Sequence, residues 1–151
     1  MTRIIFHIDV NSAYLSWTAV SLLKKGEPID LRTIPSIIGG SIEDRHGIVL
    51  AKSTSAKKHG IVTGEPIIQA MQKCPNLIAY PPDFALYSKC SRAMFDILSE
   101  YSDRIEPFSI DEGFLDYTGS PVWASNRSRK SHSEAHPCRA WLYRQYRHQH
   151  Q

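Results

Sequence analysis

Three carboxylates lie inside apolar segments, where a charged side chain is costly to bury. Asp9 follows the run F-H-I, while Asp111 and Glu112 lie between S-I and G-F-L. A buried carboxylate needs compensation, and Mg²⁺ can supply it because this ion prefers carboxylate and phosphate oxygens. Two such ions can hold the attacking and leaving oxygens of a phosphoryl displacement. The three acids therefore predict a divalent metal site, and pairing with a backbone amide or an Arg is the simpler alternative.

Two strand segments must bring these acids together. The apolar run 3–10 predicts a buried strand, and residues 105–117 predict two strand-like pieces around 109–112. Neighbouring residues of a regular strand face opposite sides. Asp111 and Glu112 can share one site only if the strand bends there, or if Glu112 uses its longer reach.

Helical and strand patterns alternate between the acidic segments. A first helix is predicted after a cap at Asn11 or Ser12, with Gly26 as its stop. Its apolar positions are predicted to face the core: Tyr14, Trp17, Val20 and Leu23. Shorter elements follow: strands at 31–38, 47–51 and 77–80, a polar loop at 42–45, and helices at 52–58 and from 64 to before Pro75.

The clearest helix begins after a cap at Asp83. Its apolar residues form one stripe that predicts core packing: Tyr87, Cys90, Met94, Ile97, Leu98 and Tyr101. The pattern changes after Thr118, because residues 119–151 are rich in Ser, Arg, His and Gln and lack helix or strand periodicity. These patterns together favour an α+β domain followed by a tail of different character.

Composition excludes several classes of protein. The chain has 151 residues, of which 42% are hydrophobic and 22% charged. No apolar run approaches the roughly 20 residues that span a bilayer, and the N-terminus lacks the features of a signal peptide, so we expect a cytoplasmic protein with no membrane partner. Three Cys residues without a C-x-x-C pair argue against a disulfide framework and a structural zinc site.

The basic net charge comes from the tail. The whole chain has a formal net charge of +3, but residues 1–118 hold 12 Lys or Arg and 14 Asp or Glu, a net charge of −2. Residues 119–151 hold six basic residues and one acid. Charge alone therefore does not indicate nucleic-acid binding by the body of the protein.

Four motifs, in this order, resemble the UmuC/DinB-type (Y-family, DNA polymerase IV-like) translesion DNA polymerases. The H-I-D-V-N-S-A-Y segment at 7–14 resembles the opening palm motif, and A-K-S-T-S-A-K-K-H-G-I at 51–61 resembles the fingers motif. K-C-P-N at 73–76 also fits, and S-I-D-E-G-F-L-D at 109–116 resembles the second acidic motif. The order and spacing of the motifs over about 115 residues are more specific than any one motif.

The resemblance implies a fold. It predicts a partial polymerase palm from residues 1–12 and 83–118, with a mixed or antiparallel sheet backed by helices. Residues 13–82 would form a small α/β fingers insertion, and 119–151 a non-homologous, disordered tail.

The resemblance also implies roles for single residues. Asp9, Asp111 and Glu112 would be the catalytic acids that hold two Mg²⁺ ions, with Mn²⁺ as a substitute, and the Val10 carbonyl would add a ligand. Tyr14 falls at the steric gate that rejects a ribose 2′-OH, although a core aromatic is the alternative.

Two further positions match the family's triphosphate-binding residues imperfectly. Lys57 stands where the family usually has Arg, so it can supply charge but not a bidentate fork. Thr54 replaces the usual Tyr, and Lys57 without the resemblance is part of a solvated helix face.

The implied reaction is template-directed nucleotidyl transfer from a dNTP to a primer 3′-OH during DNA repair and damage bypass, in the setting of the SOS response. Primer–template DNA and dNTP are the expected partners, with a sliding clamp for full-length members. We expect this chain to be a truncated N-terminal fragment, inactive alone, because the thumb and the DNA-gripping domain of the family supply most phosphate contacts. The alternatives are a non-catalytic regulatory or interaction protein that reuses palm and fingers, and another two-metal enzyme such as a nuclease.

The tail has a possible origin in a shifted reading frame. Read from the second base of each codon, residues 141–150 permit G-F-T-V-N-I-G-I-S-T, which resembles the next palm strand of the family. We therefore interpret 119–151 as an out-of-frame translation of that segment, with a functional extension as the alternative.

Overall fold

The computed structural model describes residues 3–40 and 47–119 of the chain. These residues form two compact units, one built from the N-terminal residues up to Val10 together with the chain from Ser88 onward, and one built from Asn11–Tyr87. Both contain helices and sheet, so the predicted α+β class is confirmed. The polar loop predicted at 42–45, the tail beyond Gly119 and its shifted frame lie outside the described residues.

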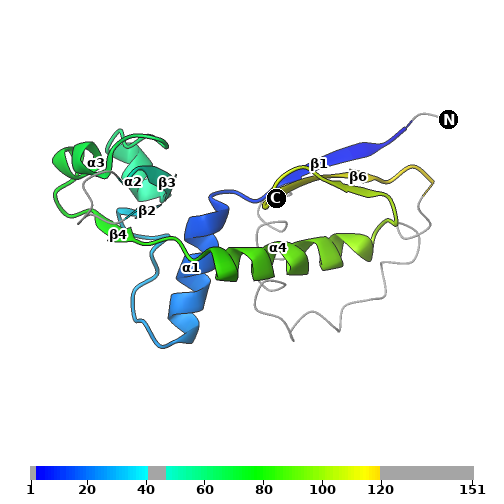
Figure 1. Ribbon diagram of the computed structural model, residues 1–151, viewed down its shortest axis with the longest axis horizontal. Coiled ribbons are helices and arrows are strands. Elements are labelled where there is room, and N and C mark those ends of the chain that lie inside the picture. Colours follow the sequence, from blue (N-terminus) through cyan, green and yellow to red (C-terminus); the bar gives the residue numbers. More distant parts are fainter. Residues whose placement is uncertain (1–2, 41–46, 120–151) are drawn as a thin grey trace. The chain divides into compact units, whose positions relative to one another are not determined.

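The first unit contains a three-stranded antiparallel sheet. Its strands are β1 (Ile5–Asp9), β5 (Ile105–Pro107) and β6 (Glu112–Asp116), in the order β1-β6-β5. Figure 1 shows β1 and β6 side by side, with the C-terminal part of α4 (Phe84–Ser99) running along them. The predicted pair of strand pieces around residues 109–112 is present as β5 and β6.

One face of this sheet is covered by α4. A Cβ atom added to Gly113 would lie 2.8 Å from Cε1 of Phe95, so the helix packs closely at this point and requires glycine there. Leu115, two residues further along the same face, is buried. The opposite face of β6 carries Glu112 and Phe114, which are only partly buried.

The prediction of a buried strand at 3–10 was wrong about burial. Ile5 and Phe6 are each 45% exposed, and Asp9 is exposed as well. Within the described residues β1 is an edge strand of a sheet with one helix-covered face. The apolar run therefore does not have the coverage on both faces that such a run normally indicates.

The second unit contains a mixed sheet in the order β3-β2-β4. β2 (Ser36–Gly39) is antiparallel to β3 (Val49–Lys52) and parallel to β4 (Ile78–Tyr80). Three helices belong to this unit: α1 (Ala13–Lys24), α2 (Thr54–Lys58) and α3 (Ile67–Lys73). None of the helices in the described part of the chain is both long and apolar enough to cross a membrane.

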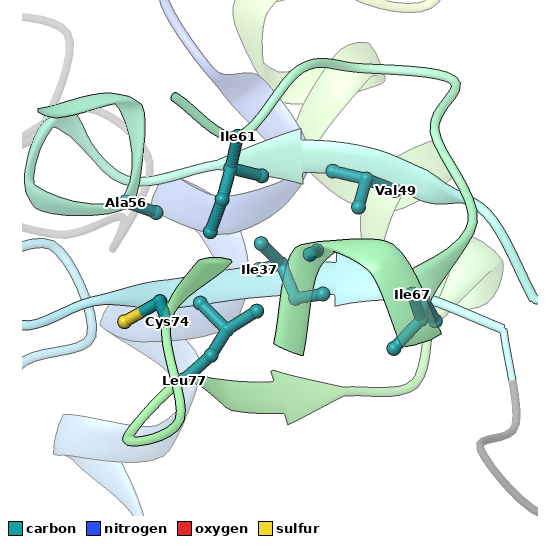
Figure 2. Packing of buried hydrophobic residues seen from close by; sticks show 8 residues of the cluster. Ile37, Val49, Ala56, Ile61, Ile67, Cys74 and Leu77 are labelled. Carbon is teal, nitrogen blue, oxygen red and sulfur yellow. The ribbon is translucent and has the colours of Figure 1, made fainter. Parts of the chain in front are cut away.

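A small apolar core lies between α2, α3 and the sheet (Figure 2). Ile37 at the centre of β2 is fully buried and packs with side chains from both helices. The cluster consists of Ile37, Val49, Ala56, Ile61, Ile67, Ala70, Cys74 and Leu77. Cys74 and Cys90 are buried, and Cys138 lies outside the described residues.

The first helix buries a different set of residues from the predicted stripe. Trp17 is buried as predicted, but Leu23 is 37% exposed and Val20 is only partly buried. The buried residues surround the first half of the helix instead: Ala13, Leu15, Ser16, Trp17, Thr18 and Ala19. The prediction assumed one continuous stripe, whereas the N-terminal half of α1 is enclosed and the C-terminal half reaches solvent.

The strand predicted at 31–38 is much shorter in the structure, where β2 begins at Ser36. The preceding residues form a turn, because Asp30 Oδ1 accepts a hydrogen bond from the Arg32 backbone N–H at 3.0 Å and Asp30 O accepts one from Thr33 N–H at 3.0 Å. An Asp that bonds the backbone two residues later commonly starts a turn.

Candidate functional site

The register of β1 and β6 brings the acidic motifs together. Asp9 lies directly opposite Glu112, and opposite residues of antiparallel strands project from the same face. The next residue, Val10, donates its backbone N–H to the carbonyl of Asp111 at 3.1 Å. The backbone therefore places Asp9, Val10, Asp111 and Glu112 at one end of a single strand pair.

Asp111 lies in a bend rather than in a regular strand. Residues 109–111 form bends and β6 begins only at Glu112, so strict alternation of faces does not apply to Asp111. Ser109 shapes this turn, because its hydroxyl donates to Asp111 Oδ1 at 2.9 Å and accepts the Asp111 backbone N–H at 3.3 Å. The backbone N–H groups of Phe108 and Ser109 both donate to the carbonyl of Glu112.

The carboxylate of Glu112 faces a histidine of the neighbouring strand. Glu112 Oε1 lies 3.5 Å from His7 Nε2, with the two side chains 26% and 50% exposed. Thus Asp111 is engaged by Ser109, and Glu112 is close to His7. As these side chains stand, the described residues contain no group of three or more His, Cys, Asp or Glu arranged to hold a metal ion.

The donor set nevertheless fits a hard divalent cation in type and in backbone position. Three carboxylates and one backbone carbonyl are ligands that Mg²⁺ accepts, and the β1–β6 register places them on adjacent positions.

The third acid of the second motif, Asp116, has a different role. Asp116 Oδ1 accepts the Thr118 backbone N–H at 2.9 Å, and Asp116 Oδ2 lies 3.0 Å from the Arg3 guanidinium and 3.5 Å from that of Arg104. The hydrogen bonds from Thr118, followed by those of Arg3, hold the pKa of the Asp116 carboxyl well below its usual range. Asp116 therefore anchors strand ends and is not available as a metal ligand.

Tyr14 lies in the second unit, on the first turn of α1, and is partly buried. Its ring stacks on Tyr87 at a centroid distance of 4.4 Å and an interplanar angle of 8°, and the edge contact with Phe84 is at 6.3 Å. Tyr87 is fully buried and its hydroxyl lies 3.0 Å from that of Thr18. Tyr14 is thus supported by the core on one side while part of its surface stays accessible.

Thr54 and Lys57 both lie on α2 and are exposed. Residues three apart on a helix are neighbours on its surface, so these two side chains share one face. Ser53 caps the helix by accepting the Ala56 backbone N–H at 3.0 Å. The acids belong to the first unit and Tyr14, Thr54 and Lys57 to the second.

Sequence reasoning did not single out His7 and Ser109, which contact the acids. A signal existed for each. His7 is two residues before Asp9, so strand alternation places both on one face. Ser109 is two residues before Asp111, a spacing at which a Ser hydroxyl commonly bonds the local backbone.

Known proteins resemble this chain in sequence. Residues 8–141 match the model of the impB/mucB/samB family. The chain is 57% identical over 118 residues to DNA polymerase IV of Clostridium acetobutylicum, covering 78% of this chain and 30% of that protein. It is 45% identical over 120 residues to DNA polymerase IV 1 of Bacillus subtilis, covering 80% and 28%.

The fold has solved counterparts. An insertion ternary complex of Dbh DNA polymerase superposes with a TM-score of 0.63 at 28% sequence identity, over 76% of this chain and 32% of that chain. The chain belongs to the impB/mucB/samB family. Its relatives are Y-family polymerases of the DinB type, and it spans about 30% of the length of the first curated relative. The family match continues past Thr118 to residue 141, so the boundary at 118 and the shifted frame remain predictions.

Proposed function

We propose that this chain supplies the palm and fingers of a translesion DNA polymerase, which transfers a nucleotide from a dNTP to a primer 3′-OH on a DNA template. The observation that carries the proposal is the β1–β6 register, which sets Asp9 opposite Glu112 and joins Val10 to Asp111. Relatives named DNA polymerase IV and the insertion complex of a related polymerase support it. A cytoplasmic role in the response to DNA damage accords with that activity.

Asp9, Asp111, Glu112 and the Val10 carbonyl would hold two Mg²⁺ ions, with Mn²⁺ as a substitute. Such ions neutralise charge on the attacking and leaving oxygens of a phosphoryl transfer. The chain's own contribution is positioning: the hydrogen-bonded ends of β1 and β6 hold the backbone of all four ligands at one end of the strand pair. Preorganisation of this kind supplies much of the catalysis in phosphoryl transfer.

Tyr14, Thr54 and Lys57 would contact the nucleotide. Stacking on buried Tyr87 holds the Tyr14 ring in one place, which a residue that excludes a ribose 2′-OH requires. Lys57 and Thr54 present an ammonium and a hydroxyl on one exposed face of α2, the groups suited to phosphate oxygens. Lys57 would act as a point charge rather than as a fork.

Divalent metal should stabilise the chain through these acids. Binding to the folded state alone contributes about 2.7 kcal/mol when the free metal is at about 100 times its Kd. We expect Mn²⁺ and Mg²⁺ to raise the melting temperature of the wild type, and Asp9→Ala, Asp111→Ala or Glu112→Ala to reduce or abolish that rise. Asp103→Asn, which changes a 95% exposed acid outside the site, is the matched control. A wild-type melting curve that metal leaves unchanged would contradict the proposed site.

A second candidate function is a non-catalytic interaction protein that reuses palm and fingers. It is favoured by the net charge of −2 over residues 1–118, because a DNA-gripping surface needs an excess of Lys and Arg. Under this alternative, a fusion of this chain to the rest of a relative would not give metal-dependent primer extension.

A further inference from the structure

His7 lies on the open face of the first unit's sheet, beside the acids. It is directly opposite Phe114 in the β1–β6 register, and the two rings stack at a centroid distance of 4.7 Å and an interplanar angle of 21°. Phe108 packs edge-on against Phe114 at 5.9 Å and 74°. The imidazole is therefore stacked on Phe114, which itself packs against Phe108, although half of the His7 side chain is exposed.

The same ring presents a nitrogen to Glu112. Phe114 and Glu112 are two residues apart on β6 and so share a face, which makes His7 and Glu112 diagonal neighbours across the strands. Their closest atoms, Nε2 and Oε1, are 3.5 Å apart. His7 thus faces one of the two carboxylate oxygens, and the second oxygen can serve another partner.

We propose that His7 is a positioning residue for Glu112: it engages one carboxylate oxygen and so presents the other to a divalent cation shared with Asp9. This inference rests on the proposed function. Asp9 lies directly opposite Glu112, and two carboxylates at that spacing repel one another without a cation. An imidazole N–H beside Glu112 offsets this repulsion and fixes the orientation of the ligand, as partners of metal-bound carboxylates commonly do.

The alternative is a surface contact between His7 and Glu112 that affects neither stability nor metal binding, since pairs between exposed groups often contribute nothing measurable to stability. The two readings differ in what the ring nitrogen does. If His7 only packs on Phe114, a phenyl ring should replace it fully. If His7 orients Glu112, the nitrogen itself is required and an amide placed similarly should substitute for it.

The first arm of the test needs no metal. Long-range proton–nitrogen NMR spectra of the 151-residue chain, recorded at one fixed pH, report the two ring nitrogens of each histidine. Glu112→Gln should shift the His7 ring resonances. Glu106→Gln should leave the His7 ring resonances unchanged. Glu106 is also directly opposite Phe114, but it lies on β5, whereas His7 lies on β1. Unchanged His7 resonances in Glu112→Gln would overturn the proposal.

The second arm measures Mn²⁺ affinity from the free-ion signal in electron paramagnetic resonance. His7→Phe keeps the stack on Phe114 and removes the nitrogen, and we expect it to weaken Mn²⁺ binding about 10-fold or more, the usual effect of losing such a partner. His7→Gln, which restores an N–H donor, should bind within about threefold of wild type. Equal affinity of His7→Phe and wild type would overturn the proposal.

Failure of the proposed function has a different signature. If the wild-type chain shows no Mn²⁺ binding that depends on Asp9, the proposed cation site is ruled out. The proposed role of His7 toward a cation is then ruled out as well. The metal-free spectra would then still show whether the His7–Glu112 contact exists. Circular dichroism of each variant separates lost binding from lost folding.

Discussion

At the scale of single residues, the acids of this chain differ in their burial and in their hydrogen-bond and ion-pair partners. Glu65, at the turn before α3, has a side chain only 7% exposed and forms an ion pair with Lys73. It also accepts the Val62 backbone N–H at 3.0 Å. The hydrogen bond from Lys73 lowers the pKa of the Glu65 carboxyl, and the Val62 N–H adds to this against the opposing effect of burial. By contrast, the three motif acids on the first unit's sheet are partly or fully exposed.

Removing the partner of Glu65 should destabilise the second unit in a pH-dependent way. Lys73→Met keeps most of the stem but removes the ammonium partner of a buried carboxylate, which costs about 1–3 kcal/mol at neutral pH. Because the folded pKa of Glu65 is lowered, the pair stabilises above the unfolded value of about 4.3. That contribution is lost as pH falls through the folded pKa. The deficit of Lys73→Met should therefore shrink below about pH 4.

Urea denaturation across this pH range measures the effect. Lys58→Met, which alters an exposed lysine on α2, is the control and should change the free energy of unfolding by less than about 0.5 kcal/mol. A Lys73→Met deficit that stays constant from pH 7 to pH 3 would contradict the assignment of Glu65 as the titrating partner.

At the scale of elements, some local signals were predicted correctly and burial was not. The cap at Asp83 was correct, since its side chain accepts the Leu86 backbone N–H and this depends only on nearby sequence. The cap predicted for the first helix was wrong, because Ser12 takes a left-handed backbone conformation and its side chain makes no capping hydrogen bond. The acidic motifs were predicted to lie on neighbouring strands, and β1 and β6 are paired. The predicted burial of β1 was wrong because coverage of a strand depends on elements distant in sequence.

In the candidate site, too, some features could be predicted from the sequence and others could not. The motif order identified Asp9, Asp111 and Glu112, but no spacing rule shows which way a carboxylate turns. The contacts of Glu112 with His7 and of Asp111 with Ser109 required the strand register and the bend at 109–111. Side-chain orientation is therefore the part of the site that the sequence could not supply.

Close packing of α4 on β6 at Gly113 gives an element-scale prediction. A Cβ at this position would lie 2.8 Å from Phe95 Cε1 and 3.2 Å from the Glu106 carbonyl oxygen. Gly113→Ala should therefore destabilise the fold by about 1–3 kcal/mol through overpacking. The cost should be smaller in a Phe95→Leu background, because the smaller side chain leaves room for the added methyl group.

A double-mutant cycle on the free energy of unfolding measures this coupling. Strictly additive effects of Gly113→Ala and Phe95→Leu would mean that the helix does not contact the strand at Gly113. The result bears on the site because Gly113 directly follows Glu112, so any displacement of β6 would also move the acid.

At the scale of the whole molecule, the matched region and the charge set the expected activity. The chain covers about 30% of the length of its Clostridium relative. Residues 1–118 have a net charge of −2, whereas affinity for duplex DNA comes largely from Lys and Arg contacts to phosphates. We therefore expect the 151-residue polypeptide, purified by itself, to give no measurable primer extension. Robust dNTP incorporation that Asp111→Ala abolishes would contradict this expectation.

A chimera shows whether residues 1–118 form a catalytically competent palm and fingers. These residues replace the corresponding N-terminal segment of Clostridium acetobutylicum DNA polymerase IV, with which they share 57% identity. Extension of a primed template with Mg²⁺ and dNTPs is the single measurement. We expect extension by the chimera, loss of extension in Asp111→Ala, and retention in Asp103→Asn. A folded chimera that extends no primer, or one that Asp111→Ala leaves active, would contradict this expectation.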